Sequence, residues 1–331
     1  MNAHLPSQTV PARRRARLFL CAALLLPAPG LLHAQLAPDR VIRLVIPFAV
    51  GSSTDAVSRI IAPELGKRLA ATVIVDNRAG ANGAIGAVTV AKAAPDGLTF
   101  LVGGASVNVI NPALYRSLPY DPVADLMPVA RIGMSPMMLL AHPSLPFKDV
   151  AGLIDYAHKH PGKLAYGTPN SVTMVGMENF KIRAGVDILS VPYKSSPQAV
   201  TDLVANQVQV LISEFATAMP LAKAGKARVI AVTSPAPSPM LPGVPTVAEV
   251  LEGFDVTGWL GLFAPRGTSP EIISRVSSVF VEVLSLPEIR ERLRILGFDA
   301  APLDSAAFGP YFTSQLNGWK KLVHDAGIQP E

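Results

Sequence analysis

Residues 41–69 constrain the fold most, because a buried strand, a short polar loop and a helix follow one another there. Residues 41–48 are apolar apart from Arg43, as expected for a strand buried on both faces of a parallel sheet. The polar loop 49–54 comes next, and Asp55 opens a helix whose apolar residues recur at helical spacing. A strand that leads into a helix in this way predicts an α/β protein.

The same alternation continues along the chain. Strands are expected over residues 72–75 and 98–103, with a glycine-rich loop and a helix between them. A second series begins near residue 149, with helices expected over 149–160, 198–206 and 216–224 and strands over 164–167, 188–191, 208–212 and 228–233. Alternating strands and helices favour parallel sheets with right-handed crossovers. A chain of 331 residues is long enough for two cores, so we predict two α/β domains, the first crossing lying near residues 133–140.

Two polar loops, residues 49–54 and 105–108, follow strands of the first series and therefore lie at one edge of the predicted sheet. Open α/β sheets bind ligands at the carboxyl ends of their strands. A loop that leads into a helix also directs free backbone N–H groups and the positive end of the helix dipole at one point. These loops therefore predict an anion site. The alternative is an ordinary turn in which Asp55 caps the helix.

The first 34 residues have the three parts of a secretory signal peptide: a basic run, an apolar run and the segment PAPGLLHAQ, in which we expect a cut after Ala34. The apolar run is shorter than the roughly 20 residues that span a membrane, so we predict export and cleavage near Ala34. The single cysteine, Cys21, lies in this leader, and the mature chain is predicted to lack thiol chemistry.

The charge of the chain changes once the leader is set aside. Four of the 29 basic residues and none of the 24 acidic ones lie in the leader, which leaves 25 against 24. A nearly neutral chain argues against nucleic acid as a partner, because nucleic acid is bound by concentrated positive charge.

The mature chain lacks the sequence patterns of common catalytic and metal sites. It contains no HExxH motif, no GxSxG nucleophile elbow and no Walker loop. His158 and His160 are two residues apart on a predicted helix and point to different faces, which does not suit a shared metal. The glycines at positions 80, 83 and 86 do not have the spacing of a dinucleotide-binding turn. We therefore predict no catalytic residues, no metal and no cofactor.

A family resemblance runs from about Arg40 to the C-terminus. It rests on several segments in order, among them IRLVIPFAVGSSTD, VDNRAGANGAIGA, AKAAPDGLTFLVG, VPYKSSPQAVTDLVANQV and WLGLFAPRGTSPEI. The chain resembles the Bug family (TctC-like) of periplasmic substrate-binding proteins, which are receptors of tripartite tricarboxylate-type transporters. The resemblance implies the two-domain, type II-like flytrap fold of periplasmic binding proteins, with a ligand cleft between the domains and two crossings. It also implies a periplasmic location and a small carboxylate ligand: a di- or tricarboxylate, an acidic amino acid or an aromatic acid.

We place domain 1 at residues 35–136 plus 260–331 and domain 2 at residues 137–259. No Arg or Lys lies in segments 47–55, 103–109 or 168–173, so we expect backbone amides, small hydroxyls and bridging waters to hold the ligand. Asp55 is interpreted as a fixed helix cap or as a partner for a ligand ammonium. The predicted ligand-binding residues are Phe48, Gly51, Ser52, Thr54, Asp55, Ser106, Asn108, Thr168, Asn170, Thr173 and Tyr193.

Four positions depart from the usual family pattern. Val50 and Ser52 replace a proline and a glycine of the first loop, Met174 stands where histidine is common, and Ser195 replaces the glycine of VPYKG. The predicted ligand loops therefore differ more from the family pattern than the scaffold segments do. The expected partners are the ligand and membrane components of a transporter, with the chain as a monomer. The alternatives are a sensor module without a transporter and a secreted enzyme.

Overall fold

The computed structural model describes Met1 and residues 40–330, so the predicted leader and its cleavage site lie outside the described part. The contacts of the chain separate Met1–Gln35 from Leu36–Glu331, and the second of these units contains every helix and strand described here. Within the described part, no helix combines the length and the apolar character that crossing a membrane requires.

The first sheet has the strand order β2-β1-β3-β10-β4. Its strands are β1 (Val41–Ile46), β2 (Thr72–Asn77), β3 (Thr99–Gly104), β4 (Leu126–Ser135) and β10 (Gly258–Pro265). The strands β1, β2 and β3 are parallel, as predicted. However, β10 runs antiparallel to both of its neighbours, because it brings the chain back at the edge where β1 and β3 end. Leu44 and Ile46 of β1 are buried on one face and Val45 on the other, as expected for a covered strand.

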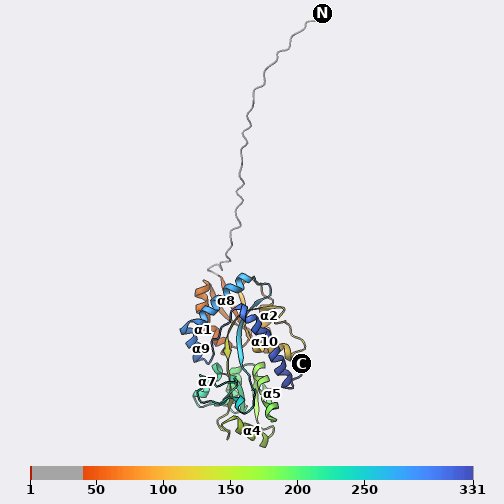
Figure 1. The fold of residues 1–331 in the computed structure, drawn as a ribbon, viewed down its shortest axis with the longest axis vertical. Helices are drawn as coiled ribbons and strands as arrows, with labels where there is room; N and C mark the ends of the chain where they lie inside the picture. The colour runs from red at the N-terminus through yellow and green to blue at the C-terminus, as the bar shows by residue number, and fades with distance from the viewer. Residues whose placement is uncertain (2–39, 331) are drawn as a thin grey trace. The chain divides into compact units, whose positions relative to one another are not determined.

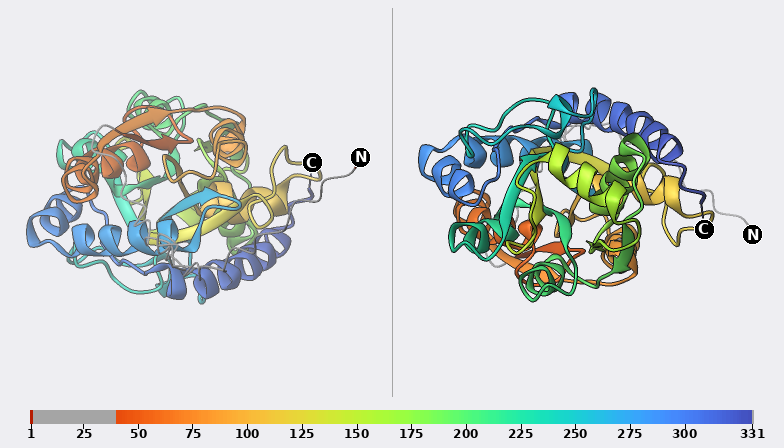
Figure 2. Two further views of the ribbon diagram at one scale, coloured as in Figure 1. Left: turned by 90° about the horizontal axis from the view of Figure 1, so that it is seen from above. Right: turned by 90° about the horizontal axis from the view of Figure 1, so that it is seen from below.

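Helices cover both faces of the first sheet. On one face α1 (Ser53–Leu69), α8 (Pro270–Ser285) and α9 (Pro287–Ile295) bury their apolar residues, and on the other face α2 (Ala84–Ala91) and α10 (Ser305–Asp325) do so. Figure 1 shows these five helices together around one end of the described body. In Figure 2, the helices α8 to α10, in blue, lie along one side of it. The short elements of this part are η1 (Ala81–Gly83), η2 (Ala105–Ile110) and α3 (Asn111–Leu114).

The second sheet has the order β7-β6-β8-β5-β9. Its strands are β5 (Met137–Ala141), β6 (Ala165–Thr168), β7 (Leu189–Pro192), β8 (Val210–Glu214) and β9 (Arg228–Val232). The strands β6, β7 and β8 are parallel, whereas β5 is antiparallel to β8 and to β9. One face packs against α4 (Val150–Lys159) and α5 (Ser171–Ala184), and the other against α6 (Ser196–Val204) and α7 (Phe215–Lys223). A short helix, η3 (Val247–Glu249), follows β9.

The chain crosses between the two sheets twice. It leaves the first sheet after Ser135 and enters the second at Met137, inside the predicted crossing region. It returns between Val232, the end of β9, and Gly258, the start of β10. This is the predicted two-domain α/β architecture with two crossings. The domain bounds given above stay a prediction.

Three element boundaries near the predicted site differ from the expectation. The helix α1 begins at Ser53, not at Asp55, because the Ser52 hydroxyl accepts a hydrogen bond from the Asp55 backbone and caps the helix. The segment 105–108 lies in the π-helix η2 and is not an open loop. The helix α5 begins at Ser171, so Thr173 lies inside its first turn.

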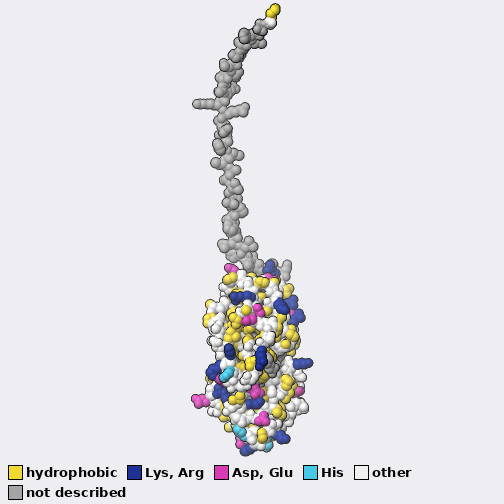
Figure 3. Space-filling view, turned by 90° about the vertical axis from the view of Figure 1, so that its right-hand side faces the viewer, with side chains coloured by type: hydrophobic (Ala, Val, Ile, Leu, Met, Phe, Trp, Pro, Cys, Tyr) yellow, Lys and Arg dark blue, Asp and Glu magenta, His cyan; other side chains and the backbone are white. Residues whose placement is uncertain are grey.

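Charged side chains are mixed on the surface that Figure 3 shows. On this face, Lys and Arg side chains alternate with Asp and Glu side chains and do not gather into a large patch of one sign. This mixture agrees with the nearly balanced charge of residues 35–331, which contain 25 basic and 24 acidic residues.

Candidate functional site

A cavity of about 50 Å³ lies where the ends of strands from both sheets meet. Twenty residues line it, and they come from both sheets and from the helices that follow their strands. They are Phe48, Ala49, Ser52, Ser53, Thr54, Gly104, Ala105, Ser106, Ser135, Met137, Pro169, Asn170, Val172, Lys194, Ser195, Ser196, Glu214, Gly258, Trp259 and Leu260. The cavity therefore lies where we predict the ligand cleft, between the two sheets.

Four helices begin at this cavity. The residues that precede the helices α1, α5, α6 and α7 are Ser52, Asn170, Ser195 and Glu214, and all four line the cavity. The N-terminus of each helix carries a partial positive charge and backbone N–H groups without partners inside the helix. Four such ends around one small cavity favour an anion.

Two backbone N–H groups at the start of α1 are available to a ligand. The N–H of Gly51 donates to Asp55 Oδ2 over 3.0 Å, and the N–H of Ser52 donates to the Ala49 carbonyl over 3.2 Å. In contrast, the N–H groups of Ser53 and Thr54 make no hydrogen bond within the described part of the chain. Both residues are buried and line the cavity. The anion-binding groups of this loop are thus these two, rather than the amide of Gly51.

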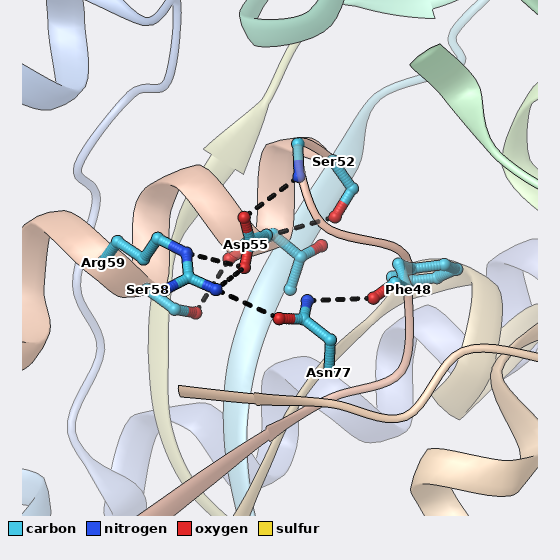
Figure 4. Close-up of polar contacts among 8 residues, drawn as sticks. Phe48, Ser52, Asp55, Ser58, Arg59 and Asn77 are labelled. Carbon is cyan, nitrogen blue, oxygen red and sulfur yellow. Dashed lines mark hydrogen bonds and ion pairs between the residues drawn. The ribbon is translucent and has the colours of Figure 1, made fainter. Parts of the chain in front are cut away.

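Asp55 braces the loop through hydrogen bonds that Figure 4 shows. Its carboxylate accepts hydrogen bonds from the Gly51 backbone and from Arg59 Nε, each over 3.0 Å. Arg59 also donates to Asn77 Oδ1 over 3.1 Å, and Asn77 Nδ2 donates to the Phe48 carbonyl over 3.0 Å. These contacts tie both ends of the loop to the end of β2.

The pKa of Asp55 reflects this network. Burial alone would raise the pKa, but hydrogen bonds from Arg59 and from the Gly51 backbone outweigh it and hold the pKa below its usual value. The helix cap is Ser52, so the interpretation of Asp55 as the cap was wrong. Its carboxylate oxygens are occupied by protein donors, and it does not line the cavity.

The residues that follow β3 join the two sheets. Ser106 Oγ accepts a hydrogen bond from the Val172 backbone over 3.3 Å, and Ser171 Oγ donates to Asn111 Oδ1 over 2.6 Å. Each bond connects a residue that follows β3 with the first turn of α5. Asn108 is buried and faces the end of β3, where its Oδ1 accepts from the Gly104 backbone over 3.0 Å.

On the side of the second sheet, Asn170 and Glu214 form a partly buried pair. Asn170 Oδ1 accepts from the Thr173 backbone over 3.1 Å, and Asn170 Nδ2 donates to Glu214 Oε1 over 2.9 Å. Burial raises the pKa of Glu214, against the opposing effect of nearby donor groups on its own backbone, Asn170 and Ser196, of which Asn170 alone forms a hydrogen bond to it within the described chain. Lys194 is exposed and is the only basic residue among the described residues that line the cavity.

Five of the eleven predicted ligand-binding residues line the cavity: Phe48, Ser52, Thr54, Ser106 and Asn170. Gly51, Asp55 and Asn108 do not line it and are engaged in the hydrogen bonds described above. The other three also bond elsewhere. Thr168 Oγ1 donates to the Val191 carbonyl, and Thr173 Oγ1 donates to the Asn170 carbonyl. The Tyr193 hydroxyl lies near Asp202, and burial together with this carboxylate raises the pKa of Tyr193 to about 12. Ligand contact by any of the eleven stays a prediction.

Several lining residues were not predicted, notably Ser53, Lys194, Glu214 and Trp259. Lys194 follows Tyr193 in a segment already recognised as a motif, so the signal was present there. Glu214 follows an apolar run at the start of a helix, which is the position that Ser52 and Asn170 occupy in their own units.

Within the described residues, no three His, Cys, Asp or Glu side chains are grouped so that they could hold a metal ion.

Comparison with known proteins gives a consistent result. The family model of the tripartite tricarboxylate transporter family receptors (TctC) matches residues 57–328. A UPF0065 protein encoded in the tcbD-tcbE intergenic region of Pseudomonas sp. (strain P51) is 33% identical over 315 residues, which cover 94% of each chain. The protein BugT of Bordetella pertussis (strain Tohama I) is 31% identical over 300 residues, covering 89% of this chain and 92% of BugT.

Solved structures agree. The R. palustris protein Rpa4515 with adipate has a TM-score of 0.86 and 33% identity, covering 89% of this chain and all of that one. The periplasmic binding protein BugD has a TM-score of 0.83 and 29% identity, covering 88% of this chain and 99% of BugD. MatC (Rpa3494) from Rhodopseudomonas palustris with bound malate has a TM-score of 0.80 and 31% identity, covering 86% and 99%. The chain therefore belongs to the TctC family of tripartite tricarboxylate transporter receptors, periplasmic solute-binding proteins that include the Bug proteins.

Proposed function

We propose that the protein captures a small carboxylate in this cavity in the periplasm and delivers it to the membrane components of a tripartite tricarboxylate-type transporter, without catalysing a reaction. The observation that carries the proposal is the pair of free, buried N–H groups of Ser53 and Thr54 at the start of α1. Two relatives support the ligand class, because their structures are described with adipate and with malate.

The cavity suits such a ligand chemically. Small hydroxyls of Ser52, Ser106 and Ser196 stand near the helix starts and complement the backbone N–H groups. The site can therefore hold an anion through dipoles and hydroxyls, with waters bridging where a ligand is short. Because residues from both sheets line the cavity, a bound ligand would touch both and favour their approach.

The first test is a thermal-shift screen of the mature protein against a panel of carboxylates. At a ligand concentration of about 100 times Kd, binding stabilises the folded state by about 2.7 kcal/mol, which raises the melting temperature by several degrees. Sugars and simple cations serve as controls. A shift with one of these and with no carboxylate would contradict the proposal.

The second test places a negative charge at the start of α1. Asp caps helices as well as Ser does, so Ser52→Asp keeps the helix start and adds a charge that lines the cavity. At a few ångströms in a partly dry site, a like charge costs about 1–4 kcal/mol, or about one to three decades of carboxylate affinity.

The matched control is Ser234→Asp. Ser234 lies in the proline-rich connector after β9, does not line the cavity and donates its hydroxyl to the Ala236 carbonyl. Calorimetry on both folded variants should show weakened carboxylate binding in Ser52→Asp alone. Equal affinity of Ser52→Asp and wild type would place the anion elsewhere.

A further inference from the structure

Glu214 is the only acidic residue that lines the cavity, among the residues that the structure describes. It ends β8 and precedes α7. Its Oε1 accepts the hydrogen bond from Asn170, whereas its Oε2 exposes less than 1 Å² and has no partner within the described chain. A buried carboxylate oxygen without a donor is costly, so a ligand donor brought within reach of this atom would stabilise it.

A carboxylate in an anion site discriminates among acids. Next to an ionised Glu214, the charged end of a plain carboxylic acid would place two like charges together, which disfavours binding. A ligand whose other end is an ammonium would instead supply both the missing donor and the opposite charge. The burial that raises the pKa of Glu214 is the kind of penalty that a nearby cation offsets.

The two groups belong to different sheets. The N–H groups of Ser53 and Thr54 follow β1 of the first sheet, and Glu214 ends β8 of the second. A ligand that carries a carboxylate and an ammonium therefore has one complementary group on each sheet. Trp259 adds a buried indole Nε1 without a partner in the described chain to the same cavity lining.

We infer that the ligand is an amino acid rather than an unsubstituted carboxylic acid, with its carboxylate at the Ser53 and Thr54 N–H groups and its ammonium at Glu214 Oε2. This inference rests on the proposed function and narrows its ligand class. Glu214 is then a specificity-determining residue of the site.

Calorimetry with matched acid pairs tests the inference on the wild-type protein. The pairs are L-alanine and propionate, L-aspartate and succinate, and L-glutamate and glutarate, and the members of each pair differ by one amino group. In at least one pair we expect the amino acid to bind about 10- to 100-fold more tightly, as for a hydrogen bond to a charged group.

The variant Glu214→Gln keeps the size of the side chain and removes its charge. We expect it to weaken binding of the amino acid about 10-fold or more, while binding of the plain acid stays the same or becomes tighter. A merely structural role would weaken both. The matched control is Glu252→Gln, which makes the same charge change at an exposed position outside the cavity.

The outcomes separate the inference from the proposal beneath it. If plain acids bind at least as tightly as their amino partners, or if Glu214→Gln weakens both members equally, the inference is wrong while carboxylate binding stands. If neither the pairs nor the wider carboxylate panel bind, the proposed function itself is wrong. The wild-type comparison decides the inference alone if Glu214→Gln does not fold.

Discussion

A proline at the first residue of α1 tests directly whether the backbone binds the ligand. Ser53 occupies this position, and its N–H group has no partner within the described chain. Proline is favoured at the first helical residue, where its missing N–H is not used by the helix. The preceding residue, Ser52, has φ −69° and ψ 160°, which is the extended conformation that precedes proline. Ser53→Pro therefore removes one proposed ligand donor and keeps the helix start.

The expected loss of affinity follows from the bond that is removed. A hydrogen bond to a charged group contributes about 1.5–3 kcal/mol, so carboxylate binding should weaken about 10- to 150-fold. Because the substitution also removes the hydroxyl of Ser53, the matched control is Ser53→Ala, which removes only that group. The free energy of unfolding should change by about 1 kcal/mol or less, since proline also restricts the unfolded chain.

The assay is isothermal calorimetry with the carboxylate that stabilises the wild-type protein most, on both variants, alongside their melting temperatures. The informative quantity is the ratio of the two dissociation constants. If both variants are folded and bind the carboxylate equally well, the N–H of Ser53 does not contact the ligand, and α1 is not its anchor.

Two further predictions concern the brace of the first loop and the leader. Asp55→Asn should lower the free energy of unfolding by about 1–2 kcal/mol at neutral pH, because the carboxylate accepts bonds from Gly51 and from the half-exposed Arg59. The pKa of Asp55 is lowered in the folded state, so its contribution is present above the unfolded pKa of about 3.9 and is lost as the pH falls through the folded value. Urea unfolding at pH 7 and near pH 3 should show the difference from wild type shrinking in acid, and a constant difference would refute this account. For the leader, the mass of the intact protein isolated from the periplasm should place the N-terminus near Gln35. The same protein should contain no titratable thiol, because Cys21 is removed with the leader. A periplasmic protein that still carries residues 1–34 would contradict the predicted cleavage.

The fold was largely predictable because its signals are local. Continuous apolar runs such as residues 41–48 indicate strands that are covered on both faces. The segments that follow such runs have apolar residues at helical spacing, which indicates helices. The direction of β10 was not predictable in this way. It depends on where the chain re-enters the first sheet, and that is a property of the whole path rather than of residues 258–265.

The sequence correctly predicts that the first loop leads into a helix at the edge of the sheet. It does not predict which backbone N–H groups of this loop are free to bind a ligand. The Asp55 side chain occupies the N–H of Gly51, and the Ala49 carbonyl occupies that of Ser52. Sequence spacing shows that a carboxylate stands near such a loop. It does not show which N–H groups the carboxylate takes and which it leaves for a ligand.

Glu214 shows why the other half of the site could not be read from the chain alone. The predicted strand ended at residue 212, two residues short of the observed end of β8, so Glu214 was assigned neither to the strand end nor to the helix start. Its place in the site becomes clear only when the starts of four helices are seen to meet at one cavity. Three of the four helix starts at the cavity are preceded by neutral residues, Ser52, Asn170 and Ser195, and one is preceded by an acid. This difference makes the cavity electrostatically asymmetric, with free N–H groups on the side of the first sheet and a carboxylate on the side of the second. A ligand with one negative and one positive end complements that asymmetry, whereas a ligand with two negative ends does not.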